Sequence, residues 1–120
     1  MLEQAHDDIR YWFYRIQDAF PDVHTCRVWC GKEEQDRLVK EKASLLKWPY
    51  SKHNAMKDGQ PCSLAMDLFR LKEDGEADFR AGFYVQIANY LDDLGAPIAW
   101  GGSWKTFPDL DHFELKPKIS

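Results

Sequence analysis

A catalytic zinc site could be built from four residues of this chain: His53, Asp67, Asp109 and His112. Two imidazoles and one carboxylate, supplied by His53, Asp67 and His112, would leave the fourth position of a tetrahedral zinc open, as a catalytic zinc requires. A further carboxylate beside the metal, such as that of Asp109, could take a proton from water. One zinc ion is therefore the first hypothesis for a cofactor.

Each candidate also has a simpler interpretation. Asp67 lies between Met66 and Leu68, and a carboxylate in an apolar strand is costly unless it is paired or bound to a metal. The alternative is an aspartate on the solvent face of an alternating strand. His53 could be a solvated loop residue, and His112 could be a surface histidine before an edge strand.

Asp109 and Asp111 are rival candidates for the base. Asp109 precedes His112 by three residues. In a strand, Asp111 would point away from the side that His112 faces. We therefore expect Asp109 to be the base and Asp111 to be a solvated or supporting carboxylate.

The segments that carry these residues predict helices around a small antiparallel sheet, which is the α+β class. Apolar residues at helical spacing predict a helix over residues 2–20, which Pro21 ends. The other expected elements are strands over 23–29, 63–71 and 112–115 and helices over 32–46 and 83–94. The candidate ligands would then lie on a loop, a strand and a strand start.

A length of 120 residues predicts a single domain, 1–120, with no separate cell-wall-binding domain. The net charge of −4 gives little support for a nucleic-acid partner, because phosphate backbones are bound by basic surfaces. No apolar run approaches the length of a membrane span. The three cysteines, an odd number, are expected to be reduced thiols. The N-terminus lacks the features of a signal peptide, so we expect synthesis in the cytoplasm, and the chain is expected to be a monomer.

Three short motifs together resemble a known family. They are Ser51-Lys52-His53, Ala65-Met66-Asp67 and Asp109-Leu110-Asp111-His112. Their order, with Trp100-Gly101-Gly102-Ser103-Trp104 and the ending His112-Phe113-Glu114-Leu115, is similar to that of the zinc D-alanyl-D-alanine peptidases of the VanY and VanX type. The resemblance is nearest to their phage branch, the L-alanyl-D-glutamate endopeptidase endolysins. It covers residues 23–115.

The resemblance implies a fold of the hedgehog/D,D-peptidase type and a zinc metallopeptidase that cuts the stem peptide of bacterial peptidoglycan. It implies zinc held by His53, Asp67 and His112, with Asp109 as the base. The expected activity is that of an L-alanyl-D-glutamate endopeptidase from a phage or prophage, acting on periplasmic peptidoglycan after release by a holin. A D,D- or L,D-carboxypeptidase of the same family is the alternative.

The chain departs from the family at two places. His53 and Asp67 are fourteen positions apart, farther than is usual, and Asp58-Gly59 predicts a turn in the added loop. Cys30 stands where the family usually has an arginine ahead of a Glu-Gln pair. Arg27 or Lys32 could replace that arginine at the substrate. Its loss also favours a function of another class, a catalytically inactive binding module stabilised by zinc.

Several neighbours of the candidate ligands could support them. Ser51 could orient His53 through a hydrogen bond, or simply start a turn. Trp100 and Trp104 could line a substrate groove, although core packing beside a Gly-Gly turn explains them as well. Gly101 and Gly102 predict a tight turn or a close backbone approach.

Overall fold

The structure of the protein is a computed structural model that describes residues 1–117. Its helices are α1 (Asp7–Ala19), α2 (Lys32–Lys40) and α3 (Ala81–Asp93), with short 3-10 helices η1 (Leu2–Gln4), η2 (Lys52–Asn54) and η3 (Gly101–Ser103). One sheet contains β1 (Val23–Arg27), β4 (Ala65–Leu71), β5 (Ala77–Asp78), β6 (Ile98–Trp100) and β7 (His112–Leu115). A separate hairpin pairs β2 (Met56–Lys57) with β3 (Gln60–Pro61). The predicted α+β class with a small antiparallel sheet is confirmed.

The sheet places three polar residues in one row. Its order is β1-β4-β7-β6, all neighbours are antiparallel, and β5 pairs with the end of β4. Asp67 of β4 lies opposite Arg27 of β1 on one side and opposite His112 of β7 on the other. Directly opposed residues of an antiparallel pair share a face of the sheet. The row Arg27–Asp67–His112 is therefore set by the backbone register.

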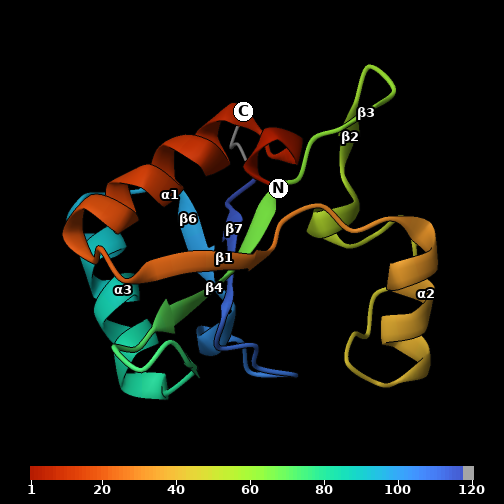
Figure 1. Cartoon of the computed structure of the whole chain (residues 1–120). Helices are drawn as coiled ribbons and strands as arrows, with labels where there is room; N and C mark the ends of the chain where they lie inside the picture. The colour runs from red at the N-terminus through yellow and green to blue at the C-terminus, as the bar shows by residue number, and fades with distance from the viewer. Residues whose placement is uncertain (118–120) are drawn as a thin grey trace.

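The other face of the sheet packs against α1 and α3 and forms the core. Residues four apart on each helix share one face, which gives each helix an apolar stripe toward the sheet. Figure 1 shows α1 and α3 together on one side of the molecule and α2 apart from them on the other side. The buried core includes Ile9, Phe13 and Ile16 of α1, Phe83, Ile87 and Leu91 of α3, and Met66, Leu68 and Phe113 of the sheet.

Some predicted boundaries were wrong. The helix predicted over 2–20 is divided, because Ala5 bridges to Ser63 and the His6 side chain caps α1 by accepting a hydrogen bond from the Asp8 N–H. The helix predicted over 32–46 ends at Lys40, and Lys42 has a left-handed φ of 61°. Strand β6 and the β2–β3 hairpin were not predicted, because a strand of two or three residues carries almost no periodicity.

A buried polar network connects α2 to η2. The Asn54 side-chain N–H donates to Gln35 Oε1 (3.1 Å) and to the Cys30 carbonyl oxygen (2.9 Å). Gln35 Nε2 donates in turn to Ser44 Oγ (3.0 Å) and to the Leu46 carbonyl oxygen (2.5 Å). Because unpaired buried polar groups are costly, these bonds fix α2 and the following loop beside the segment that carries His53.

Two further predictions concern cysteines and membranes. Cys26, Cys30 and Cys62 are all free, as expected for reduced thiols. None of the helices within residues 1–117 is both long and apolar enough to cross a bilayer.

Candidate metal centre

The structure brings His53, Asp67 and His112 together from η2, β4 and β7. His53 Nε2 lies 3.1 Å from Asp67 Oδ1 and 3.1 Å from His112 Nδ1, and His112 Nδ1 lies 3.2 Å from Asp67 Oδ1. All three residues are buried, with 4–6% of their surface exposed. Three donor atoms from distant segments therefore form one compact triangle.

The triangle fits a zinc ion. A tetrahedral zinc with bonds of about 2.0–2.1 Å separates its ligand atoms by about 3.3 Å, close to the spacings seen here. The two facing imidazole nitrogens, 3.1 Å apart, need a proton or a cation between them, because two lone pairs at that distance repel. The donor set of two nitrogens and one oxygen is one that zinc accepts while keeping a position open.

Hydrogen bonds on the far side of each imidazole fix which nitrogen faces the triangle. His53 Nδ1 donates to the Val28 carbonyl oxygen at 2.6 Å, so Nε2 is presented. His112 Nε2 donates to Glu114 Oε1 at 2.8 Å, so Nδ1 is presented. A carbonyl or carboxylate partner of this kind is the usual support of a metal-bound histidine.

The electrostatics of the triangle favour a bound cation. Burial would raise the pKa of Asp67, but hydrogen bonds from His112 and His53 outweigh it and hold the pKa well below its usual range. Burial would lower the pKa of His112, but hydrogen bonds to Asp67 and Glu114 and the charges of these two carboxylates raise it to about 9. The site thus stabilises positive charge at the position that a metal would take.

Zinc uptake is expected to release a proton from His112. With no metal bound, a pKa of about 9 leaves the ring protonated on both nitrogens at neutral pH, whereas a metal requires the Nδ1 lone pair. Apparent zinc affinity should rise about tenfold per pH unit from pH 7 to about 9 and then level off. Titration calorimetry in two buffers of different ionisation enthalpy measures the released proton, and uptake without proton release would contradict this expectation.

The same shift affects the stability of the metal-free fold. A folded-state pKa raised above the unfolded value stabilises the fold fully below that unfolded value, near 6.5. This contribution is lost as the pH rises through about 9.

Both candidate bases lie near Asp67, one of the three members of the triangle. The carboxylate oxygens of Asp67, Asp109 and Asp111 lie within 4.8 Å of one another. Strand alternation does not apply to Asp111, because β7 begins only at His112 and Asp111 lies in the preceding turn. Burial above all raises the pKa of Asp111 to about 8, and a hydrogen bond with Asp109 adds to it. Asp109 lines the cleft into which the triangle opens, and Asp111 does not.

Gly101 sets the position of Asp109. The Asp109 N–H donates to the Gly101 carbonyl oxygen at 3.0 Å. A Cβ atom on Gly101 would lie 2.5 Å from the Asp109 carbonyl oxygen and 3.1 Å from His112 Cβ. The close backbone approach predicted for the Gly-Gly pair is thus confirmed at Gly101.

The triangle opens into a cleft of about 320 Å³. One wall comes from the sheet and η2, and the other comes from α2 and the loop that follows it. Arg27 lines the cleft with Nη1 3.7 Å from Asp67 Oδ2 and Nε 3.4 Å from Glu34 Oε1. The apolar and aromatic lining includes Leu38, Leu45, Leu46, Tyr50, Trp104 and Phe107. A cleft with an apolar wall and one arginine suits a ligand that has both apolar and anionic groups.

Of the supporting residues that the sequence suggested, Ser51 and Trp104 line the cleft and Trp100 does not. Ser51 lines the cleft and its hydroxyl oxygen accepts from the His53 N–H at 3.2 Å. The Trp104 ring lies 5.0 Å from the His112 ring. Trp100 does not line this cleft; its ring stacks on Phe113 and its N–H donates to the Leu110 carbonyl oxygen.

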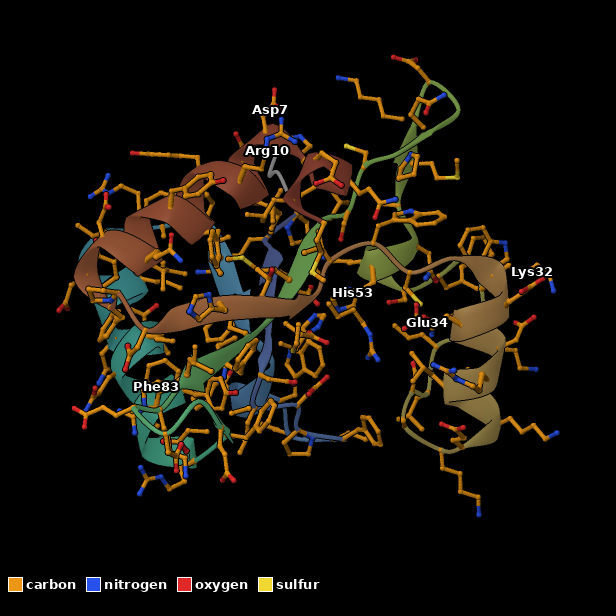
Figure 2. All side chains as sticks on the ribbon, viewed as in Figure 1. Asp7, Arg10, Lys32, Glu34, His53 and Phe83 are labelled. Atoms are coloured by element: carbon orange, nitrogen blue, oxygen red, sulfur yellow. The ribbon has the colours of Figure 1, made fainter. Side chains whose placement is uncertain are left out.

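Lys32 lies outside the cleft. Its ammonium pairs with Asp36 at 2.7 Å, and Figure 2 shows it pointing outward from α2, whereas His53 points into the space between α2 and the sheet. Helical periodicity explains this, since Lys32 and Asp36 share the solvent face while Gln35 faces inward. Of the two candidates for the absent arginine, the structure places Arg27 at the site.

Sequence reasoning missed three contacts. Glu114 was named only as part of the ending His112–Leu115, and no sequence pattern indicated its hydrogen bond with His112. Lys52, whose ammonium lies 2.7 Å from Glu114 Oε2, was read only as part of a motif. The Val28 carbonyl group carried no signal at all, because any residue could supply it.

The fold and the donor triangle define an α+β protein with a candidate catalytic metal centre in a cleft. No family model matches the sequence, and no curated protein matches it. A solved structure that it resembles is the L-Ala D-Glu endopeptidase ChiX of Serratia marcescens, with a TM-score of 0.75 and 21% identity over 96% of this chain and 83% of that one. The two chains share a fold. The narrower likeness to the VanY and VanX type stays a prediction.

Proposed function

We propose that this chain is a zinc-dependent peptidoglycan hydrolase that cleaves the stem peptide between L-alanine and D-glutamate. The observation that carries the proposal is the buried triangle of His53, Asp67 and His112 at the base of a cleft, with the Asp109 carboxylate beside it. The shared fold with a protein named as an L-Ala D-Glu endopeptidase supports the choice of substrate.

The residues of the site have separate roles in the proposed hydrolysis. His53, Asp67 and His112 would hold the zinc, which when bound lowers the pKa of a water molecule and polarises the carbonyl group. Asp109 accepts the proton of the attacking water and passes it to the leaving amine. The hydrogen bonds from His53 to Val28 and from His112 to Glu114 keep both imidazoles oriented during this cycle.

Arg27 is expected to bind a substrate carboxylate. It lies on the cleft wall, and its contacts with Asp67 and Glu34 are long enough to be exchanged for a closer anion. A hydrogen bond to a charged group contributes about 1.5–3 kcal/mol. Arg27→Met should therefore lower kcat/KM about 10–150-fold, mainly through KM, on a stem-peptide substrate.

Lys32→Met is the matched control. Like Arg27→Met it removes one positive charge, but Lys32 lies outside the cleft and pairs with Asp36. Its kinetics should match those of the unmodified protein. Equal losses in the two variants would point to a general charge effect instead of a contact in the cleft.

Digestion of purified Gram-negative sacculi by the zinc-loaded protein, followed by mass spectrometry, tests the function. Peptides that begin at D-glutamate, with L-alanine left on the sugar, are the expected products. Loss of D-alanine alone would identify a D,D- or L,D-carboxypeptidase. Intact sacculi with zinc bound would favour the inactive binding module. Periplasmic action after holin-type release belongs to the same proposal.

A further inference from the structure

Lys52 connects the two histidine-bearing segments of the metal centre. Its ammonium lies 2.7 Å from Glu114 Oε2 and donates to the Leu115 carbonyl oxygen at 2.8 Å. Glu114 uses its other oxygen, Oε1, to accept from His112 Nε2 at 2.8 Å. Lys52 also directly precedes His53 in η2. The Lys52 side chain thus links η2, which carries His53, to Glu114, which bonds to His112.

This pair differs from an ordinary surface ion pair. Only 30% of the Lys52 side chain and 16% of the Glu114 side chain are exposed. Each Glu114 oxygen has its own donor, so the carboxylate is held at both ends and cannot rotate away from His112. The lysine makes a second bond to the main chain of β7, which fixes its own position. Exposed pairs contribute little because they lack such constraints.

We propose that Lys52 is a positioning residue of the metal centre, acting through Glu114 to hold His112 with Nδ1 toward the metal while it clamps η2 to β7. The inference rests on the zinc centre proposed above but not on the reaction. Removal of a residue that hydrogen-bonds to a metal ligand typically changes the metal affinity 10–100-fold, and Lys52 holds Glu114, the residue that bonds to His112. Lys52 would therefore control metal retention without being a metal ligand itself.

Zinc affinity, measured by competition with a chromophoric chelator, tests the proposal. Lys52→Met keeps the aliphatic chain and removes the donor, and it should weaken zinc binding about 10–100-fold. Lys52→Arg, which can still donate to Glu114 and to the carbonyl group, should retain most of the affinity. Lys57→Met removes an exposed lysine of the nearby β2–β3 hairpin and should bind zinc like the unmodified protein.

A second variant keeps the test independent of folding defects in Lys52→Met. In the unmodified protein, Lys52 and His112 each donate to a separate oxygen of Glu114. Glu114→Gln leaves a single side-chain oxygen for both donors, so this variant should weaken zinc binding by a similar factor. The His112 Nε2–H proton resonance of the zinc-loaded protein should also move upfield. Circular dichroism and thermal unfolding in the presence of a chelator establish that each variant is folded.

The outcomes separate this inference from the proposed function. Folded Lys52→Met or Glu114→Gln proteins with unchanged zinc affinity and an unchanged proton resonance would overturn the positioning role. An unmodified protein that binds no zinc would overturn the metal centre itself. Zinc binding that weakens in these variants, in a protein without peptidase activity, would support the positioning role and reject only the reaction.

Discussion

Asp109→Ala is expected to reduce kcat on stem-peptide substrates about 10²–10⁴-fold, the usual contribution of a positioned general base. Zinc affinity should change little, because Asp109 is not part of the donor triangle. The physical reason is the loss of the proton acceptor beside the metal, while the other side chains of the cleft remain. Single-turnover kinetics together with metal analysis of the purified variant measure both quantities.

Asp111→Asn tests which of the two neighbouring carboxylates is the base. Its expected loss is smaller than that of Asp109→Ala, because Asp109 lines the cleft and Asp111 does not, and an asparagine amide can still donate a hydrogen bond at position 111. A larger loss in Asp111→Asn than in Asp109→Ala would reverse the two roles. Full activity in Asp109→Ala would remove Asp109 from the mechanism.

His53→Ala is expected to weaken zinc binding strongly and to lower the activity with it. Structural zinc sites with four protein ligands gain about 10–16 kcal/mol from metal binding, an average of about 2.5–4 kcal/mol per ligand, and we take that average for His53. At about 1.4 kcal/mol per factor of ten, the zinc affinity should fall about 10²–10³-fold. The activity lost by chelation of the unmodified protein should return with added zinc, and in His53→Ala it should stay low at matched zinc concentrations.

His24→Ala is the control for this variant. His24 lies on β1 with its ring against Phe69, and it is not among the candidate ligands. Chelator competition should give the affinity of the unmodified protein. Zinc binding in His53→Ala as tight as in His24→Ala would show that the metal lies elsewhere.

Much of the site could be predicted because its residues carry distinctive chemistry. An aspartate inside an apolar strand, as at Asp67, is unusual enough to indicate a partner. The strand of His112 was predicted with its observed bounds, since polar and apolar residues alternate there. The α+β class followed from elements long enough to show their periodicity.

The rest depended on distances that sequence patterns do not contain. The choice between Arg27 and Lys32 required the β1–β4 register, which places Arg27 opposite Asp67, and a bulge between Thr25 and Arg27 shifts that register. The Lys52–Glu114 contact joins residues 62 positions apart in the sequence, counted from 52 to 114. The turn position of Asp111 depended on where β7 begins, and strand ends are the least certain part of any pattern.

We expect the two walls of the cleft to differ in how often they unfold locally. The ligands of the sheet wall sit on β4 and β7, which pair with each other beside the buried core. The opposite wall, α2 and its loop, is joined to η2 through the side chains of Gln35 and Asn54. Regions held by few buried contacts exchange their amide hydrogens through local unfolding, whereas central strands exchange mainly through global unfolding. Selection could thus change how wide the cleft opens while the β4–β7 pairing that carries Asp67 and His112 stays intact.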